Sequence, residues 1–354
     1  MTFSRILVTG GAGFIGTAVV RQLLERGTSV VVLDALTYAA SPEALDEFSE
    51  LPGFRLEPGD VRDSADITRL LGDFQPDAVI HLAAETHVDR SIDGPRVFLE
   101  TNVSGTVMVL ESVTAWWRER PADARDRFRL IQVSTDEVFG SLGPDDPPFT
   151  PETPYRPRSP YSASKASADH FARAWHETFG LPVIVTNCSN NFGPWQFPEK
   201  FIPVVISRAL AWEPIPIYGA GDQVRDWLHV DDHASGLLAA LDHGVPGRTY
   251  LFGARNEWPN RALAELICDI LDGILPDGRG ARRKLIETVT DRPGHDARYA
   301  IDPEAAEREL DWEPRHGFTD VLRDTVQWYV DHHSWVEGRL IKLGGYRRRG
   351  LGSS

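Results

Sequence analysis

The chain has 354 residues, of which 42% are apolar and 25% charged, a composition typical of folded globular proteins. Its 52 acidic and 37 basic residues give a formal net charge of −15, which argues against general nucleic-acid binding because phosphate neutralisation needs a basic surface. Two cysteines, Cys188 and Cys268, are too few for a disulfide framework, and we expect a reducing, cytoplasmic location.

The first strand is predicted at 5–10, RILVTG. The N-terminal stretch MTFSRILVTGG has neither the basic start nor the long apolar run of a signal peptide. No apolar run in the chain approaches the roughly 20 residues that a membrane-spanning helix needs. An amphipathic helix is predicted at 14–27, and the intervening TGGAGFIG contains Gly10, Gly13 and Gly16. Glycines at this junction allow close backbone approach to a pyrophosphate, so they predict a dinucleotide site, although ordinary turns also use glycine.

Acidic residues end the next two predicted strands. The run 29–35 contains Asp34, where a carboxylate can accept hydrogen bonds from an adenosine ribose and would repel a 2′-phosphate. This position favours NAD over NADP, the alternative being an aspartate in a surface turn. Asp60, in GDVRD, follows a third strand and is placed to meet the adenine amino group.

Continuous apolar runs at 77–84 and 128–134 predict strands buried on both faces, and the segment 96–119 between them has helical periodicity. A further helix is predicted over 160–180, followed by a strand at 181–187. This alternation predicts an α/β fold with a Rossmann-type, doubly wound parallel sheet.

The composition and the pattern of predicted elements change after about residue 190. Pro, Gly and Trp become frequent there, and helices such as 260–274 are separated by long loops. We expect a NAD-binding Rossmann domain over 1–187, to which a later segment near 220–235 returns. A smaller, mainly substrate-binding lobe over 188–340 and a tail over 341–354 complete the expected organisation.

Tyr161 and Lys165 stand four positions apart on the predicted helix 160–180 and therefore share one face. A nearby ammonium lowers the pKa of a phenol, and the phenolate can then remove a hydroxyl proton while hydride leaves the same carbon. The spacing alone also fits a half-exposed helical pair, but beside the glycine turn it predicts a dehydrogenase site.

Two adjacent carboxylates, Asp136 and Glu137, follow the apolar run 128–134. Adjacent side chains of a regular strand point to opposite faces, so both can reach one ligand only if the strand ends at or before them. Solvated acids in a loop are the alternative interpretation.

Five stretches narrow the interpretation to one family. They are LAAETHVDRSI (82–92), STDEVFG (134–140), SPYSASKA (159–166), TNCSNNFGPWQFPEK (186–200) and DRPGHDARYAID (291–302). With these motifs the chain resembles the extended short-chain dehydrogenase/reductase family, and within it the dTDP-glucose 4,6-dehydratases, over nearly its whole length. The adjacent acids are the most specific element, because epimerases of the same superfamily usually lack both.

The resemblance implies a set of site residues. The NAD cofactor would meet Gly10, Gly13, Phe14, Ile15, Gly16, Asp34, Leu36, Thr37, Asp60, Val61, Thr101, Tyr161, Lys165 and Asn191, with Leu82, Ala83, Ala84 and Glu85 on the nicotinamide side. The nucleotide sugar would meet Thr86, Thr135, Asn190, Lys200, Phe201, Pro216, Ile217, Tyr218, Arg225, Asn260, Asp291, Arg292 and His295. Arg225 and Arg292 would clamp the diphosphate, because a guanidinium fork matches phosphate oxygens, although either also fits an ordinary surface arginine. No residue is expected to bind a metal.

The resemblance also implies a reaction in which dTDP-glucose loses water to give dTDP-4-keto-6-deoxyglucose. Tyr161 would take the 4-hydroxyl proton, beside Thr135 and Lys165, as hydride passes to NAD⁺. Glu137 would remove the C5 proton, and Asp136 would donate a proton to the departing C6 hydroxyl. Burial and the like charge of Glu137 would keep Asp136 protonated. Hydride would then return to C6.

Positions that depart from the family pattern are Ala35, Phe139, Phe192, Trp195 and His229. None of these positions is an expected proton carrier. The departures affect what the resemblance implies about nucleotide and sugar preference. The alternatives are a dehydratase for another nucleotide sugar, a nucleotide-sugar 4-epimerase and a non-enzymatic NAD-sensing regulator. The acid pair argues against the last two, because neither needs it. The apolar face of 96–119 predicts a homodimer, because related enzymes pair such helices across a dimer, although it could simply cover the sheet.

Overall fold

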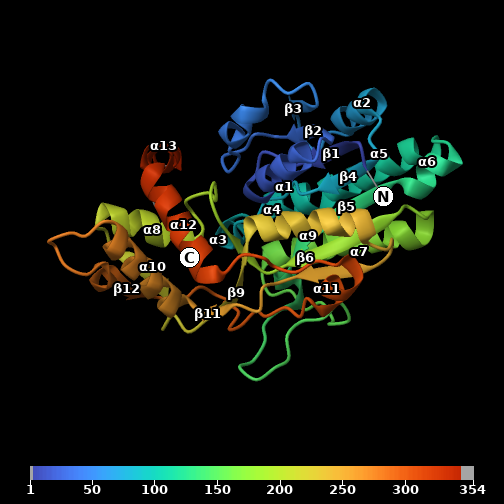
Figure 1. Ribbon diagram of the computed structural model, residues 1–354. Helices are drawn as coiled ribbons and strands as arrows, with labels where there is room; N and C mark the ends of the chain where they lie inside the picture. Colours follow the sequence, from blue (N-terminus) through green and yellow to red (C-terminus); the bar gives the residue numbers. More distant parts are fainter. Residues whose placement is uncertain (1–2, 344–354) are drawn as a thin grey trace.

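The computed structural model describes residues 3–343. Figure 1 shows a twisted sheet flanked by helices, with a smaller group of helices and short strands beside it. Of the expected tail, residues 341–343 end helix α13 (His333–Leu343), and residues 344–354 lie outside the described part. Within the described range, no helix is both long and apolar enough to cross a membrane.

The largest sheet within residues 3–343 has seven parallel strands in the order β10-β6-β5-β4-β1-β2-β3. The strands are β1 (Arg5–Thr9), β2 (Ser29–Asp34), β3 (Phe54–Pro58), β4 (Ala78–His81), β5 (Arg129–Thr135), β6 (Val183–Cys188) and β10 (Thr249–Phe252). Because the strand order reverses between β1 and β4, the loops that follow these strands diverge and leave a crevice at the carboxyl edge. The predicted α/β, doubly wound fold is confirmed.

Helices cover both faces of this sheet. One face carries α1 (Phe14–Glu25), α9 (Val230–His243) and α11 (Glu304–Leu310), and the other carries α2 (Ser64–Phe74), α5 (Thr106–Arg118) and α7 (Pro160–Phe179). The alternation of β1 shows why, because Ile6 and Val8 pack toward the first face and Leu7 toward the second. A strand that is apolar on both faces therefore reads as a continuous hydrophobic run.

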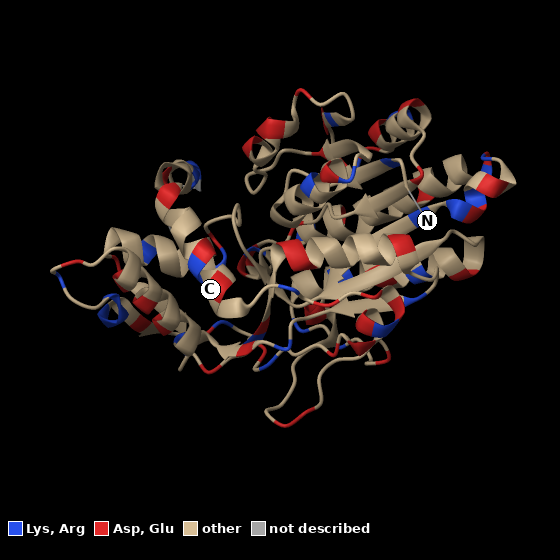
Figure 2. Ribbon diagram, viewed as in Figure 1, with Lys and Arg blue, Asp and Glu red and all other residues tan. Residues whose placement is uncertain are grey.

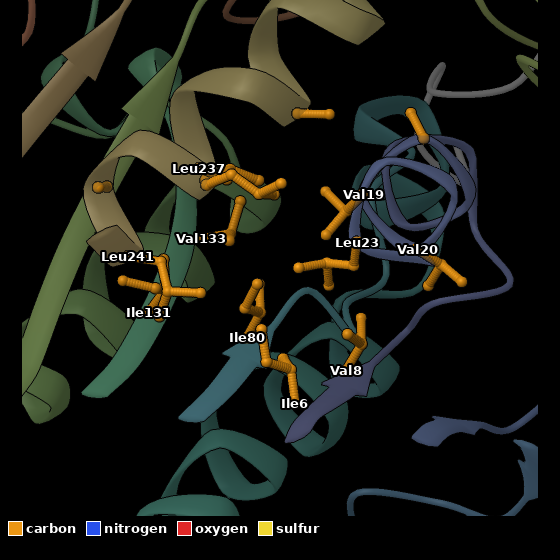
Figure 3. Close-up of a cluster of buried hydrophobic side chains, with 14 of the residues drawn as sticks. Ile6, Val8, Val19, Val20, Leu23, Ile80, Ile131, Val133, Leu237 and Leu241 are labelled. Carbon is orange, nitrogen blue, oxygen red and sulfur yellow. The ribbon is translucent and has the colours of Figure 1, made fainter. Parts of the chain in front are cut away.

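Figure 3 shows the core under the first face. Its labelled side chains are Ile6, Val8, Val19, Val20, Leu23, Ile80, Ile131, Val133, Leu237 and Leu241, from β1, α1, β4, β5 and α9. Each is at least nine-tenths buried, and burying one such side chain contributes about 1.5–3 kcal/mol. This packing holds in place the loops at the carboxyl ends of the strands, where the candidate site lies.

The smaller lobe has its own core. Its helices are α8 (Phe201–Ala211), α10 (Asn260–Ile274) and α12 (Phe318–Asp331), with α13 beside them. Its short strands are β7 (Asn190–Phe192), β8 (Ile215–Tyr218), β9 (Val224–His229), β11 (Glu257–Pro259) and β12 (Ile286–Val289). Helix α10 has the bounds predicted from the sequence.

The chain passes between the two parts more than once. In the segment expected to return near 220–235, strand β9 belongs to a small sheet, whereas α9 packs on α1. Strand β10 then joins the edge of the large sheet beside β6. The division of the chain into two functional domains stays a prediction.

The helix predicted over 96–119 is interrupted. It consists of α4 (Pro95–Phe98), a π-helical segment (Leu99–Gly105) and α5. Within the π segment, the Asn102 amide donates to the carbonyl of Glu85 at 2.9 Å and accepts from its backbone N–H at 2.8 Å. The wider turn thereby anchors the loop after β4, a tertiary contact that helical periodicity does not predict.

The remaining helices are short: α3 (Val88–Asp93), α6 (Ala122–Arg127) and the 3₁₀ helices η1 (Pro42–Phe48), η3 (Asp136–Phe139) and η4 (Arg282–Leu285). Figure 2 shows charged residues mainly on helices and loops around the outside, while the strands of the central sheet are mostly tan. Charged groups at the carboxyl edge of the sheet are exceptions to this distribution. Where they are buried, they need ion-pair or hydrogen-bond partners.

Candidate active site

The backbone that leads from β1 into α1 has no room for a side chain at two positions, one in the loop and one in the first turn of α1. Gly10 has a φ of 72°, and a Cβ there would lie 2.6 Å from the amide nitrogen of Ala83. A Cβ on Gly16 would lie 2.2 Å from the carbonyl oxygen of Gly10. Gly13 is the N-cap of α1 and has no side chain to cap it, so the first helical N–H groups can bind a phosphate.

Asp34, the last residue of β2, holds this loop in place. Its Oδ2 accepts a hydrogen bond from the backbone N–H of Ala12 at 3.0 Å, and its Oδ1 accepts from that of Leu36 at 2.8 Å. Burial raises the pKa of Asp34, while these two donors lower it. Leu36 itself is exposed, with a φ of 49°.

A cavity of about 1720 Å³, counting its open mouth, extends from the glycine loop to the end of β5. The predicted site residues in its wall are Gly10, Gly13, Phe14, Ile15, Gly16, Asp34, Thr37, Asp60, Val61, Leu82, Ala83, Ala84, Glu85, Thr86, Thr101, Thr135, Asp136, Glu137, Tyr161, Lys165, Asn190, Asn191 and Lys200. Of the predicted cofactor residues, Leu36 alone is outside this wall. The cavity thus brings together the glycine turn, the carboxylate of Asp34 and the side chains that the motifs predict to carry protons.

The two adjacent carboxylates reach this cavity because the strand ends before them. Strand β5 stops at Thr135, and η3 turns the chain at the next residue. The Thr135 hydroxyl accepts a hydrogen bond from the N–H of Glu137 and donates to Oδ1 of Asp136, both at 3.3 Å. The geometric condition derived from the sequence is therefore met.

Burial raises the pKa of both acids, and their surroundings differ. Asp136 is only 2% exposed, and burial followed by the charge of Glu137 raises its pKa well above the ordinary value. Burial also raises the pKa of Glu137, but Arg292, Lys200 and Arg225 act in the opposite direction. The protonated form is therefore favoured more strongly at Asp136 than at Glu137, where three cations favour the charged form.

Tyr161 and Lys165 share one face of α7, which begins with a capping box at Ser159. The Lys165 Nζ donates to the carbonyl oxygen of Val133 at 2.8 Å. The expected lowering of the tyrosine pKa is not observed, because burial, followed by the charge of Glu137, raises the pKa of Tyr161 well above its ordinary value. In this enclosed site, desolvation of the phenolate and the nearby negative charges outweigh the hydrogen bond with Thr135, which lowers the pKa of Tyr161.

The other predicted substrate residues lie outside that wall, in the smaller lobe. They are Phe201, Pro216, Ile217, Tyr218, Arg225, Asn260, Asp291, Arg292 and His295. Two of them meet at Asp89 of α3, whose Oδ2 accepts from the Tyr218 hydroxyl and whose Oδ1 accepts from Nη1 of Arg292, each at 2.9 Å. Nearby, Nδ1 of His295 lies 2.6 Å from Oδ1 of Asp291. Asp89 therefore connects the two parts of the molecule.

Arg225 is buried rather than a surface arginine, with 5% of its area exposed. Its guanidinium donates to the carbonyls of Val224 at 2.7 Å and Asp296 at 2.9 Å, and it lies 4.2 Å from the ring centroid of Tyr299. Because it also lowers the pKa of Glu137, it belongs to the positive surroundings of the acid pair.

The wall also contains residues that the motifs do not predict: Leu33, Ala35, Ala39, Ala40, Gly59, Arg62, Val97, Val133, Ser134, Cys188, Ser189, Gln196, Phe197 and Glu199. Arg62 pairs with Asp60, with Nη2 2.6 Å from Oδ2, so the residue expected to meet adenine already has a partner. Glu199 accepts from the Tyr38 hydroxyl at 3.0 Å and from Nε of Arg90 at 3.2 Å. Its position beside Lys200 in FPEK was the only sequence signal for it.

Comparison with known proteins assigns the family. The model of the GDP-mannose 4,6 dehydratase family matches residues 7–325. A dTDP-glucose 4,6-dehydratase from Salmonella typhimurium is 51% identical over 352 residues, which cover 97% of each chain, and dTDP-glucose 4,6-dehydratase 1 of Escherichia coli is 49% identical with the same coverage. The chain belongs to the dTDP-glucose 4,6-dehydratase family.

Solved structures of the dTDP-glucose 4,6-dehydratase family share the fold. One from Streptomyces venezuelae, solved with NAD bound, is 44% identical, with a TM-score of 0.85 over 95% of this chain and 99% of that chain. A UDP-glucose 4-epimerase from Thermus thermophilus, also in complex with NAD, is 28% identical with a TM-score of 0.81, covering 93% of this chain and 99% of that chain. The resemblance inferred from the motifs is confirmed.

The departures from the dTDP-glucose 4,6-dehydratase pattern lie mostly away from the cavity. Among them, Ala35 alone is in the described wall. Phe139 stacks within an aromatic group, and Phe192 packs edge-on against His229 with ring centroids 5.5 Å apart. Trp195 packs against aromatic side chains of α12 and α13. Phe139, Phe192 and Trp195 therefore take part in packing contacts, and none of the five positions is one that the motifs assign to proton transfer.

Proposed function

We propose that this chain catalyses the NAD-dependent dehydration of dTDP-glucose to dTDP-4-keto-6-deoxyglucose. The observation that carries the proposal is the presence of Asp136 and Glu137 in the same wall as Tyr161, Lys165 and the glycine loop. A dehydrogenase or epimerase uses the tyrosine, the lysine and the cofactor site but needs no protonated acid beside a second carboxylate. The names of its relatives support dTDP-glucose as the substrate.

The wall fits NAD chemically. Gly10 and Gly16 leave room for a pyrophosphate, Gly13 places the positive end of α1 behind it, and Asp34 can accept from a ribose hydroxyl. When bound, the cofactor accepts hydride from C4 of the sugar and later supplies it to C6. The carboxylate of Asp34 would repel a 2′-phosphate, which favours NAD over NADP.

Tyr161 acts on the 4-hydroxyl group. Its phenolate oxygen takes the hydroxyl proton, and Thr135 Oγ1 holds the 4-oxygen in position. Because burial raises the pKa of Tyr161, the phenolate needs a nearby positive charge, and Lys165 supplies one from the same face of α7.

Asp136 and Glu137 carry out the elimination. The ketone formed at C4 acidifies the hydrogen on C5, and the Glu137 carboxylate removes it. Asp136 donates its proton to the C6 hydroxyl, which leaves as water. Glu137 then returns its proton to C5, and the proton taken by Tyr161 balances the one given up by Asp136. The raised pKa of Asp136 suits a general acid.

The nucleotide is proposed to extend toward the smaller lobe. Arg225, Arg292 and Lys200 would neutralise the diphosphate, since all three act electrostatically on Glu137 at the end of the cavity. The remaining predicted substrate residues of the lobe would surround the nucleoside. On this proposal, residues 1–187 mainly bind NAD and residues 188–340 mainly bind the nucleotide sugar.

Incubation of the purified protein with dTDP-glucose and with UDP-glucose tests the proposal. The 4-keto-6-deoxy product is detected by its alkali-induced absorbance and by the mass loss of one water. We expect product from dTDP-glucose. Dehydration of UDP-glucose alone would indicate another nucleotide, inversion at C4 without loss of water would indicate an epimerase, and bound NAD without any turnover would indicate a sensor.

We also propose that the protein is a homodimer. Val97, Leu99, Phe171 and Phe179 are exposed on α4, the π-helical segment and α7, which pack on one another. A face of this kind could be covered by the same face of a second copy. Light scattering at micromolar concentration should give twice the monomer mass, and a monomer mass would contradict the proposal.

A further inference from the structure

Two further ionisable side chains continue the row formed by Tyr161 and Lys165 on α7. Asp169 and Arg173 follow at the same four-residue interval, so the four side chains lie along one side of the helix. The row begins in the cavity wall with Tyr161 and Lys165 and runs away from it. Asp169 is fully buried, at 0% exposure, and the proposed mechanism gives it no role.

Polar groups from several segments converge on one oxygen of Asp169. Its Oδ2 accepts hydrogen bonds from the Ser134 hydroxyl at 2.7 Å, the Tyr155 hydroxyl at 2.9 Å and the Asn187 amide at 3.4 Å. Arg173 supports this arrangement, because its Nη2 donates to the Tyr155 hydroxyl at 2.7 Å. Oδ1 of Asp169 has no hydrogen-bond partner among residues 3–343. Donors of this kind stabilise the charged form of a carboxylate.

Lys165 is equally enclosed, with 5% exposed, and its Nζ bonds the neutral carbonyl of Val133. A buried ammonium needs a compensating charge, which a carbonyl does not supply. Burial lowers the pKa of Lys165, and the charge of Asp169 is the main effect that raises it. Burial raises the pKa of Asp169, and the charge of Lys165 is the main effect that lowers it. Each group therefore helps to keep the other charged.

Other titratable groups around this pair do not supply that charge. His81 lies between the hydroxyls of Thr9 and Thr106, and burial lowers its pKa to about 3, so it is neutral. Burial raises the pKa values of Cys188 and Tyr155 above their ordinary range, so both keep their protons. Tyr161, on the same helix, is the group on which Lys165 acts in the proposed mechanism, and Arg173 has the same sign as Lys165.

We propose that Asp169 is a positioning residue for oxidation at C4, acting through Lys165 rather than on the sugar. Its carboxylate holds the Lys165 ammonium charged beside Tyr161, and the hydroxyls of Ser134 and Tyr155 hold the carboxylate. The inference rests on the proposed function, because it concerns removal of the 4-hydroxyl proton.

The test isolates oxidation from elimination by using the Glu137→Gln background. In that background, single-turnover formation of enzyme-bound NADH from dTDP-glucose is compared with and without Asp169→Asn. Loss of the carboxylate lowers the pKa of Lys165 further, so the ammonium is lost at lower pH and the alkaline limb of the rate shifts to lower pH. The rate at neutral pH should fall on the order of tenfold or more. The concentration of dTDP-glucose that half-saturates the rate should not change, because Asp169 does not line the cavity.

Asp232→Asn is the matched control. Asp232 is also buried, and it accepts hydrogen bonds from the backbone N–H groups of Arg315 at 3.1 Å and His316 at 3.2 Å, on the opposite face of the sheet. Its replacement should lower stability without shifting the pH profile. Ser134→Ala is a second test variant, because removing this donor raises the pKa of Asp169 and should shift the acidic limb to higher pH.

A pH profile for Asp169→Asn that superimposes on that of its parent overturns the inference. Should Asp169→Asn fail to fold, an unshifted acidic limb for Ser134→Ala overturns it instead. If the wild-type protein does not dehydrate dTDP-glucose and Glu137→Gln forms no bound NADH, the proposed function fails. This result differs from an unshifted pH profile in an active protein, which overturns only the role of Asp169.

Discussion

Replacing Asp136 with asparagine tests the proposed general acid with little change in shape. Burial and the neighbouring charge of Glu137 raise the pKa of Asp136 well above its ordinary value, so its side chain is expected to be neutral near neutral pH. Asparagine is also neutral and similar in size. Its amide oxygen can still accept the hydrogen bond from the Thr135 hydroxyl. The variant should therefore fold but cannot protonate the leaving hydroxyl.

The expected effects on stability and on turnover differ in size. The change breaks no ion pair, and Oδ2 of Asp136 has no hydrogen-bond partner within the described residues. The free energy of unfolding should therefore change by about 1 kcal/mol or less. A positioned general acid contributes roughly 10²- to 10⁴-fold in rate. This range corresponds to about 2.7–5.4 kcal/mol of activation free energy.

Rapid mixing of the Asp136→Asn variant with dTDP-glucose separates the two steps. The absorbance of enzyme-bound NADH reports oxidation at C4, and the mass of the released sugar reports loss of water. We expect NADH to accumulate while release of the dehydrated sugar slows by the factor above, with a thermal transition close to that of the wild type. Wild-type turnover in this variant would refute the role of Asp136 as the acid. Loss of NADH formation in a folded variant would place Asp136 in the oxidation step and contradict the reasoning.

Three further predictions concern the base, the cofactor loop and the pH profile. Glu137→Gln should block elimination yet leave enzyme-bound NADH, and unchanged turnover would remove Glu137 as the base. Gly16→Ala should abolish retention of NAD, because the new Cβ would lie 2.2 Å from the Gly10 carbonyl oxygen. Gly72→Ala is the control and should retain NAD, because no atom lies within 4 Å of its Cβ. The NAD content of the two purified proteins tests this prediction. Because burial raises the pKa of Glu137 and raises that of Asp136 further, kcat should rise with pH as Glu137 loses its proton and fall as Asp136 loses its own. The residual activity of Asp136→Asn should lack the falling limb, and a falling limb at the wild-type pH would contradict the assignment of Asp136.

Much of the fold could be predicted because its signals are local. The buried parallel strands are continuous apolar runs, and α10 has the predicted bounds 260–274 because apolar periodicity and flanking loops define it. The π-helical interruption at Leu99–Gly105 could not be predicted, since it depends on the contact between Asn102 and Glu85. The addition of β10 to the large sheet depends on packing beside β6, which no short stretch encodes.

The candidate site also has a part that the sequence predicts and a part that it does not. The glycine loop, Asp34 and the pair Tyr161–Lys165 could be predicted from spacing, because each belongs to one turn or one helix. The contact of Arg292 with Asp89 spans 203 positions, and the charge environment of Glu137 depends on three cations from separate segments. Asp169 also escaped prediction, although it continues the row on α7, because its role depends on a buried Lys165.

The sequence by itself indicated the alternation of strands and helices, the glycine turn and the candidate proton carriers, because these properties reside in neighbouring residues and in motifs. Only the tertiary structure decided which carboxyl groups are desolvated, which cations face them and which pKa values move. Those quantities depend on distance and burial in three dimensions, where residues far apart in the chain contribute as much as adjacent ones.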